Sequence, residues 1–578
     1  MLLMKPAIAA AEIARFSPFD TQRQVDASFT HLAHVAPDAP QGGTLRTGST
    51  VNFDSTNPMR FPGRSPNALR YTFDTLLVPS DSEPGAFYGL LAKEIEVSED
   101  FTSARFVLND KAYWHDGSAI TARDVAFTFE TVRAHGLPFD RSLLGDIVIE
   151  TEGVDTIIFQ YSGEGSWQWI SELGQFPIQS SAYWQELDPS EATLTPPMGS
   201  GPYQMTRIAF NEQVIIQRVP DYWAANHPLN RGRWNFDEIV VDYFFDNTAM
   251  IEALKKGDLD VLREWNATSW RERYAGPALD AGQLVRTAVR RQDGGSLTTL
   301  VFNLRRSLLE DVRVREAIAL ALDTQWYEEL HGSVFELPGS FYGDSRLAAK
   351  GAAAAAEQAL LAPYMADLPN EILDHGGPDE IHTGLTERQR LQRANNLLDA
   401  AGFPFEGRYR IDPDTGEQLR LTYVTAHPTT ARQLAPFQDM LERVGVTLEL
   451  SVHDYVSGRR LILDHAYDLT WLKLSANDPP GTTEQRFWHS SQSGDQGYGL
   501  AGLNHPASDM LIEIMLGSRN EGEIVTAARA FDRFLRWGHY TIPLWHEVED
   551  WYVHASGLGF PDPGRVRMDP AERWFWIR

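Results

Sequence analysis

Few residues in this chain of 578 have the types and spacing that catalysis or metal binding requires. His31 and His34 are three residues apart, so both imidazoles could lie on one helical face and hold a metal ion. No carboxylate stands beside them to complete such a site, so surface or capping histidines are the simpler interpretation. Glu547 and Glu549 could form the acid pair of a glycosidase, but 79 acidic residues make such pairs common. These groups do not predict a reaction.

The motifs of the common enzyme classes are also missing from the sequence. It contains no G-x-S-x-G elbow, no Walker loop, no H-E-x-x-H and no G-x-G-x-x-G after a strand. It contains no cysteine, which excludes disulfides, thiolate metal sites and cysteine nucleophiles. We therefore expect a protein that is not an enzyme, with no cofactor and no metal.

Aromatic side chains are better candidates for function, because they suit the binding of a ligand. Aromatics in irregular segments offer wide contact surfaces at low entropic cost, as a groove that encloses a ligand needs. The alternative is that each one fills the core of a large protein. The aromatics that stand in segments without core periodicity are Tyr88, Trp167, Trp169, Tyr342, Trp471, Trp488 and Trp545.

Length and composition limit the class of protein. A chain of this length exceeds one hydrophobic core, so two or three domains are expected. The formal net charge of −28 argues against nucleic acid, because phosphate binding needs clustered Lys and Arg. No run of eighteen apolar residues predicts a membrane span. Met1 to Glu12 is interpreted as the end of a signal peptide with a truncated apolar region, and a disordered N-terminus is the alternative.

The elements that position these residues alternate between strand and helix. Thr299 to Asp323 predicts a buried strand, then a helix that starts after Asp311, with Arg313, Arg315 and Glu316 on its exposed face. An Ala-rich helix is expected over Ala352 to Ala356. Other expected helices are Thr248–Lys256, Thr386–Ala401, Thr430–Val444 and Glu521–Trp537, and expected strands are Val214–Arg218, Glu238–Phe245, Leu419–Thr425 and Thr447–Val452. This alternation predicts α/β layers.

A series of motifs in fixed order carries a family resemblance. Thr121 is a predicted N-cap with Asp124 three residues on, within a segment similar to a D-G-x-P-x-T-A-x-D-V signature. The other matching segments are Gly42–Arg46, Phe53–Pro58, Gly199–Tyr203, Pro220–Trp223 and Thr299–Asp323. Together they resemble the family 5 extracellular solute-binding proteins, which capture peptides, opines, nickel or haem for ABC importers. A microcin-C and oligopeptide type is the nearest subgroup, on the segments His34–Gly43, Phe302–Arg306, Phe341–Ala348 and Glu484–Trp488.

The resemblance implies an α/β, two-lobed periplasmic binding protein fold (type II, cluster C) with an extra subdomain in lobe one. It divides the chain into a residual signal or disordered N-terminus, three parts of lobe one, lobe two and a return to lobe one, at residues 1–19, 20–53, 54–198, 199–291, 292–540 and 541–578. Gly294 and Gly295 are expected to form the hinge, because glycines absorb the dihedral change that a hinge needs.

The resemblance also implies a set of ligand-binding residues. The loop Trp471 to Pro479 would reach into the cleft, where oligopeptide-binding members carry an Asp that pairs with the ligand's α-ammonium. Ser475 stands at that position here, so Asp478 or Asp54 would have to substitute. Arg486 could bind a ligand carboxylate or phosphate, or form a surface salt bridge. Asn57 and Asn477 complete the predicted set, together with the aromatic residues named above.

The expected function is that of a monomeric periplasmic receptor, which captures a peptide or peptide-like solute and delivers it to the permease subunits of an ABC transporter. No nucleic-acid partner is expected. Alternatives within the family are an opine, a sugar conjugate, a metal chelate or haem as the ligand. A secreted hydrolase with an aromatic cleft, or a sensor that does not take part in transport, would lie outside it.

Overall fold

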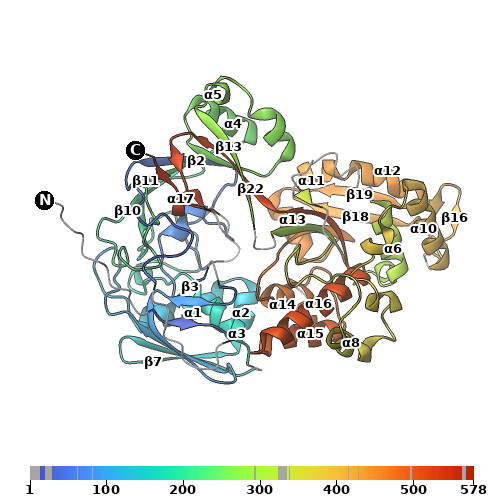
Figure 1. The fold of residues 1–578 in the computed structure, drawn as a ribbon, viewed down its shortest axis with the longest axis horizontal. Helices are drawn as coiled ribbons and strands as arrows, with labels where there is room; N and C mark the ends of the chain where they lie inside the picture. The colour runs from blue at the N-terminus through green and yellow to red at the C-terminus, as the bar shows by residue number, and fades with distance from the viewer. Residues whose placement is uncertain are drawn as a thin grey trace. The chain divides into compact units, whose positions relative to one another are not determined.

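The computed structural model describes residues 13–577 except 20–28, 61–62, 81–82, 164, 292–294, 323–334, 337–338, 414, 427, 495–497 and 563–567. The chain folds into two compact units (Figure 1). Unit 1 comprises Met1–Arg291 and Asp550–Arg578, and unit 2 is the inserted segment Gln292–Glu549. The predicted signal segment Met1 to Glu12 and the hinge residue Gly294 lie outside the described residues.

Unit 1 contains most of its strands in a seven-stranded and a four-stranded sheet. The first has the order β13-β22-β12-β2-β11-β10-β9, with strands Leu284–Arg290, Glu549–Ala555, Val261–Glu264, Thr44–Ser49, Glu238–Tyr243, Gln213–Arg218 and Tyr203–Ala209. The second has the order β5-β6-β8-β7, with strands Ala92–Val97, Ser103–Leu108, Thr156–Tyr161 and Ile147–Glu152. Smaller sheets are formed by β1 (Arg15–Phe16), β4 (Phe87–Gly89) and β3 (Leu77–Pro79), and by β23 (Leu558–Gly559) and β24 (Phe575–Trp576).

The helices of unit 1 are short and amphipathic, apart from one that is buried almost throughout. Helix α1 starts with the predicted capping box, in which the Thr121 amide donates to the Asp124 carboxylate at 2.9 Å. Helix α3 exposes only part of its surface, because seven of its residues are buried. The helices are α1 (Ala122–His135), α2 (Pro138–Gly145), α3 (Trp167–Gly174), α4 (Asn247–Lys256), α5 (Pro277–Asp280) and α17 (Pro570–Arg573).

Unit 2 is built on a six-stranded sheet with helices packed against it (Figure 1). The sheet has the order β15-β21-β14-β20-β18-β19, with strands Phe335–Glu336, Thr541–Glu547, Ser296–Phe302, Leu469–Ser475, Arg420–Thr425 and Thr447–Val452. Strands β16 (Phe405–Glu406) and β17 (Tyr409–Arg410) form a hairpin. The helices are α6 (Val312–Ala321), α8 (Ala355–Leu361), α9 (Asp379–His382), α10 (Glu387–Ala400), α11 (Pro428–Gln433), α12 (Ala435–Arg443), α13 (Tyr455–Leu463), α14 (Thr482–Trp488), α15 (Pro506–Gly517) and α16 (Glu521–Trp537).

The predicted strand-to-helix segment forms the centre of unit 2. Every residue of β14 is buried, and the Asp311 side chain caps α6 by accepting from the Arg313 amide at 2.9 Å. The prediction that Arg315 lies on the exposed face is wrong. Its guanidinium is buried and donates to the carbonyls of Gly538 and Leu309, at 2.7 and 2.6 Å. Arg315 therefore joins α6 to the turn that follows α16.

Three further expectations differ from the structure. The Ala-rich segment is helical only from Ala355, and the helix expected over Thr430 to Val444 is two helices, α11 and α12. The predicted return to lobe one at residue 541 comes too early. Strand β21, Thr541–Glu547, pairs with β14 in the sheet of unit 2, and the chain enters unit 1 at Asp550. The apolar pattern of β21 fits either unit, so only its pairing shows where it belongs.

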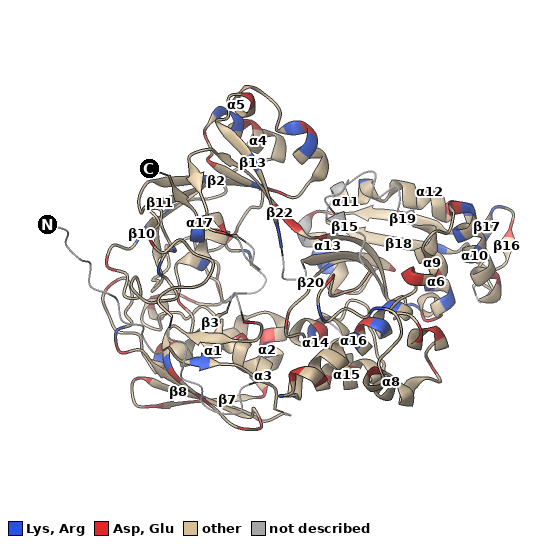
Figure 2. Ribbon diagram, in the orientation of Figure 1, with Lys and Arg blue, Asp and Glu red and all other residues tan. Residues whose placement is uncertain are grey.

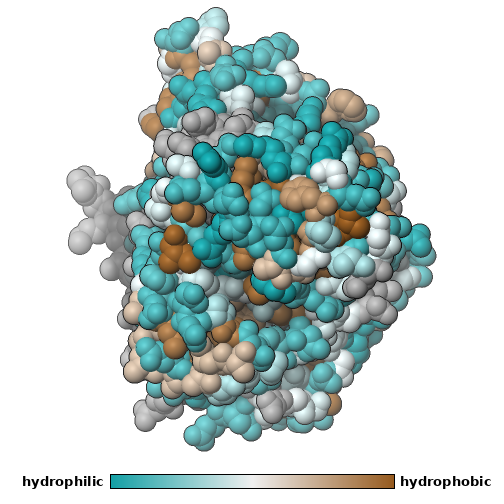
Figure 3. All heavy atoms as spheres, turned by 90° about the vertical axis from the view of Figure 1, so that its right-hand side faces the viewer, coloured by the Kyte–Doolittle hydropathy of each residue, from teal (hydrophilic) through white to brown (hydrophobic). Residues whose placement is uncertain are grey.

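The surface mixes both signs of charge with scattered apolar residues. Figure 2 shows acidic and basic residues interspersed along the helices of unit 2. On the molecular face drawn in Figure 3, hydrophobic residues are distributed among hydrophilic ones. Among the described residues, no helix combines the length and the apolar character that crossing a membrane requires.

Candidate functional site

Three strands of the unit 2 sheet present small and charged residues at one end. At this end β14 begins, while β20 and β21, which are antiparallel to it, both end. Ser296 lies opposite Ser475 of β20 and opposite Glu547 of β21. Because residues directly opposite each other project to the same side of a sheet, these three side chains share one face.

The next rows of the same face contain two of the predicted tryptophans. Thr298 lies opposite Lys473 and Trp545, and Leu300 lies opposite Trp471. Both tryptophans are partly buried and pack against the edge of the hydrophobic core that contains Leu300. We call this region the strand-end face, and its members are Ser296, Thr298, Trp471, Lys473, Ser475, Trp545 and Glu547.

An ion pair spans the strand-end face. The Lys473 ammonium donates to both carboxylate oxygens of Glu547, each at 2.7 Å. Since β14 lies between the two strands and neighbouring strands are about 4.8 Å apart, both side chains must reach over β14 to meet. The small residues Ser296 and Thr298 leave room for this crossing, and both are only 4% exposed. The Glu547 side chain is 12% exposed and that of Lys473 is 40% exposed.

Gly295 comes directly before this face and fits it closely. Its φ is +73°, a value that favours glycine. A Cβ atom at this position would lie 2.3 Å from the carbonyl oxygen of Glu547. The glycine is thus required by the packing of β14 on β21, and its predicted role as a hinge stays a prediction.

The loop after β20 holds three predicted ligand-binding residues, and its carboxylate is already paired. Both oxygens of Asp478 accept from the Arg346 guanidinium, at 2.8 and 2.9 Å. Arg346 also pairs with Glu521 at the start of α16. The Asn477 amide donates to the Thr483 hydroxyl at 2.8 Å. Asp478 is therefore neutralised within the protein, which argues against the prediction that it binds a ligand ammonium.

Arg346 belongs to the segment Phe341 to Ala348, which the sequence marks as a subgroup motif. A buried carboxylate on α16, that of Asp532, anchors both ends of this segment. It accepts from the amides of Phe341 and Ala349, at 2.8 and 2.9 Å. Burial raises the pKa of Asp532. The segment thus positions Arg346, and Arg346 holds the loop that carries Asp478.

Six of the predicted site residues are buried in the two cores. Trp169 donates from its indole to the Phe101 carbonyl at 2.8 Å, and Trp488 packs edge-on against Phe341 at 6.0 Å. The Asn57 amide donates to the carbonyls of Pro189 and Glu191, so it holds a loop in place. The structure therefore contradicts a direct ligand-binding role for the buried residues Asn57, Tyr88, Trp167, Trp169, Tyr342 and Trp488.

Two other predicted residues are exposed or partly exposed but lie away from the strand-end face. Asp54 belongs to unit 1, where its carboxylate accepts from the Arg64 amide at 2.8 Å. Arg486 lies in α14, with its guanidinium 5.9 Å from the centre of the Tyr498 ring. Sequence reasoning missed Lys473, Arg346 and the ligand-facing position of Glu547. A signal for Lys473 existed, because it is two residues from both Trp471 and Ser475 in a strand and therefore shares their face.

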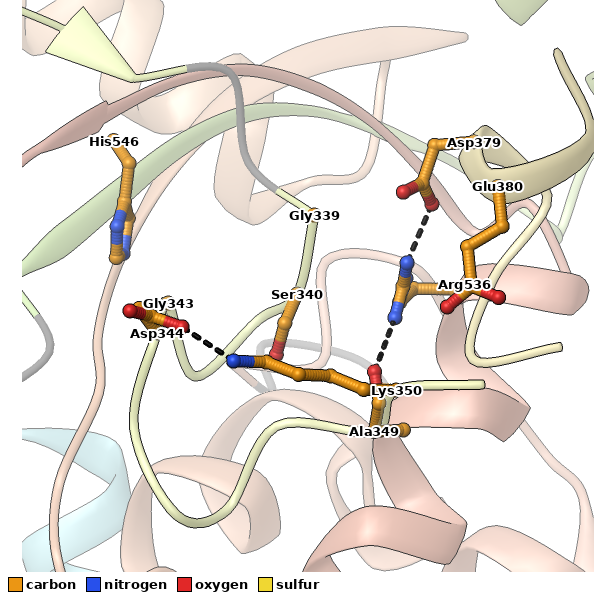
Figure 4. Close-up of a pocket in the computed structure, with 10 residues that line it drawn as sticks. All are labelled: Gly339, Ser340, Gly343, Asp344, Ala349, Lys350, Asp379, Glu380, Arg536 and His546. Carbon is orange, nitrogen blue, oxygen red and sulfur yellow. Dashed lines mark hydrogen bonds and ion pairs between the residues drawn. The ribbon is translucent and has the colours of Figure 1, made fainter. Parts of the chain in front are cut away.

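A separate polar pocket of about 310 Å³ lies in unit 2 (Figure 4). One of its walls is His546, which neighbours Glu547 in β21 and so projects to the opposite side of the sheet. Its charged groups pair within the lining, as Lys350 pairs with Asp344 and Arg536 with Asp379. Arg536 also donates to the Ala349 carbonyl at 3.1 Å. These contacts explain the charges of this pocket as structural ones.

Comparisons with known proteins identify the family. Residues 86–496 match the model of the bacterial extracellular solute-binding proteins, family 5. A protein of Escherichia coli K12 named YejA is 32% identical over 526 residues, which cover 90% of this chain and 87% of that protein. A protein of Agrobacterium fabrum named as a probable peptide-binding protein is 28% identical, over 92% of this chain and 91% of its own length. This chain therefore belongs to the family 5 bacterial extracellular solute-binding proteins, as the motifs predict.

Solved structures have the same fold. The oligopeptide-binding protein AppA of Bacillus subtilis, in complex with a nonapeptide, has a TM-score of 0.69 at 16% identity, covering 94% of this chain and all of that one (100%). NikA of Brucella suis, in complex with Fe(III)-EDTA, has a TM-score of 0.67 at 17% identity, covering 92% and 97%. At such identities the likeness concerns the fold alone, and it confirms the predicted α/β binding-protein fold.

Proposed function

We propose that this protein is the periplasmic receptor of an ABC importer, and that it captures a peptide or peptide-like solute for the permease subunits. It acts as a monomer, without turnover, and is exported by a signal peptide. The family membership supports a receptor, since the family consists of extracellular solute-binding proteins. The choice of a peptide rests on the strand-end face and on the relative named as a probable peptide-binding protein.

The strand-end face carries the proposal because its chemistry suits a peptide. Trp471 and Trp545 are partly exposed apolar surfaces that can cover a peptide backbone or side chain. The hydroxyl of Ser475, which is exposed at the end of β20, can exchange hydrogen bonds with amide groups. Mixed apolar and neutral polar walls are typical of sites that enclose a ligand largely by contact area.

A metal chelate is the second candidate, favoured by the likeness to the NikA structure with its bound Fe(III)-EDTA. Among the described residues, no group of three or more His, Asp or Glu side chains is placed to hold a bare metal ion. A chelate would supply its own ligands and would need only a complementary surface. The two candidates make different demands on the strand-end face, because Fe(III)-EDTA carries a net negative charge and a peptide backbone does not.

Native mass spectrometry of the protein purified from the periplasm tests the proposal directly. A receptor of this kind retains ligand, and we expect added masses that fragment as peptides. Peptides of two to nine residues should then raise the melting temperature of the stripped protein, whereas opines and Fe(III)-EDTA should not. Retention of a chelate or an opine alone would contradict the peptide assignment, and steady hydrolysis of the peptides would contradict a receptor.

A further inference from the structure

We infer that Lys473 and Glu547 neutralise each other so that the strand-end face accepts an uncharged stretch of peptide and binds neither a free ammonium nor a free carboxylate. The inference rests on the proposed peptide function and concerns the part of the ligand that contacts unit 2. It makes this ion pair the determinant of which part of a peptide lies on Trp471 and Trp545.

The first step of the argument is the charge present on the face itself. The strand-end face contains one cation and one anion, and the Lys473 ammonium contacts both oxygens of Glu547 at 2.7 Å. The nearest carboxylate along the chain after Ser475, that of Asp478, accepts two hydrogen bonds from Arg346. The face therefore offers a ligand no net charge.

The second step is the cost of disturbing the pair. A ligand ammonium would need Glu547 as its partner, and Lys473 would then be left without one beneath the ligand. A ligand carboxylate would need Lys473 and would leave Glu547, which is 12% exposed, in the same position. Removing one partner from a desolvated ion pair costs several kcal/mol, because the remaining charge is left uncompensated.

The third step is that the pair is part of the architecture of the face rather than a chance surface contact. Both side chains reach over β14 to meet, above Ser296 and Thr298, which are buried beneath them. Larger residues at 296 and 298 would block this crossing. A neutral amide segment can lie over the crossing side chains, contact the two tryptophans and leave the ion pair intact.

Matched peptides and single substitutions test the inference. A library of four- to nine-residue peptides without lysine, aspartate or glutamate is screened against the wild-type protein by native mass spectrometry. The tightest binder is then prepared in three forms, with free ends, with an acetylated amine and with an amidated carboxyl group. Calorimetry gives the affinity ratio of free amine to acetylated amine, and that of free acid to amide.

Lys473→Met leaves Glu547 as a lone carboxylate, and we expect the ratio of free-amine to acetylated affinity to rise at least tenfold over wild type. Glu547→Gln leaves Lys473 as a lone cation, and the ratio of free-acid to amide affinity should rise at least tenfold. The gain in Lys473→Met should fade above pH 8, where the α-amine of the peptide loses its proton.

The matched control is the pair Lys255 and Glu252 in α4 of unit 1, joined at 2.9 Å. Lys255→Met and Glu252→Gln should leave both ratios at their wild-type values. Changes of less than threefold in both Lys473→Met and Glu547→Gln, in proteins with wild-type circular dichroism, would overturn the inference. If the wild-type protein binds no member of the library, the proposed peptide function fails first, and the inference fails with it.

Discussion

Helix α3 of unit 1 and the strand-end face of unit 2 each contain two tryptophans, in opposite environments. Trp167 and Trp169 are 3% and 2% exposed and belong to the core around α1 and the four-stranded sheet. Trp471 and Trp545 only border the core of unit 2 and share their face with an ion pair and two serines. The difference lies in what covers each element. Helix α3 is enclosed, whereas the apolar core over β14 stops at Leu300.

The largest expected effect tests the enclosed side of this comparison. Trp169→Ala should lower the free energy of unfolding by about 3–5 kcal/mol, because it leaves a cavity and removes the partner of the Phe101 carbonyl. Urea denaturation followed by circular dichroism measures the change. Trp545→Ala is the matched control, with an expected loss of about 1–2 kcal/mol, since part of its side chain stays in water in the folded protein. Equal losses in the two variants would break the comparison.

The comparison also shows which features a sequence can predict. The strand β14, the cap at Asp311 and the capping box of Thr121 with Asp124 depend on residues a few positions apart, and their patterns were sufficient. Burial of a given tryptophan depends on elements that pack against it from elsewhere in the chain. Trp167 and Trp169 are two residues apart in a helix, which puts them on different faces, so no single-sided pattern marked them as core.

The remaining gaps concern long-range pairs of charged groups. Arg315 donates to Gly538, which is 223 residues away, so the pattern of α6 alone placed it wrongly in solvent. Arg346 neutralises Asp478 across 132 residues, and Lys473 meets Glu547 across 74. Each of these partners is one of many charged residues in the sequence, and only the folded chain selects between them. The candidate site was therefore predicted by its loop and two of its tryptophans, without its electrostatics.

A second prediction uses a buried ionisable group of unit 2, which should behave unlike the ion pair of the strand-end face. Burial, with Arg315, His382 and Arg393 nearby, lowers the pKa of His539 to about 3. Because this pKa lies below the unfolded value of about 6.5, stability is fully present above pH 6.5 and is lost as the pH falls. The loss from this group should reach about 2–3 kcal/mol by pH 4.5.

The variant His539→Asn isolates this contribution. His539 has a φ of +47°, a conformation that asparagine tolerates better than most residues, and asparagine does not titrate. Urea denaturation at pH 7 and pH 4.5 should show a smaller acid-induced loss in His539→Asn than in the wild-type protein. Lys473→Met, as the surface control, should lose as much as wild type. An unchanged pH dependence in His539→Asn would place the acid sensitivity elsewhere.

A third prediction separates binding from folding within unit 2. Trp471→Ala should weaken peptide binding about five- to thirtyfold, as truncation of a contact residue usually does, with little change in unfolding. Trp488→Ala should do the reverse, because Trp488 is buried against Phe341 rather than exposed to a ligand. Calorimetry and urea denaturation on both variants measure the two effects. Loss of affinity in Trp488→Ala at wild-type stability would return that residue to the site.

The smallest effect is expected from a charge added to the strand-end face. Ser475→Asp places a second carboxylate in the row of Glu547, and Lys473 can pair fully with only one of the two. The face then has a net negative charge, so a free-amine peptide should gain about three- to tenfold over its acetylated twin. The gain should be smaller than in Lys473→Met, because the ammonium of Lys473 remains and competes with that of the ligand. Ser475→Asn, which has the same shape without the charge, should show no gain in calorimetry. An equal gain in Ser475→Asn would mean that shape rather than charge governs position 475, and the contrast between a neutral face and a charged one would be lost.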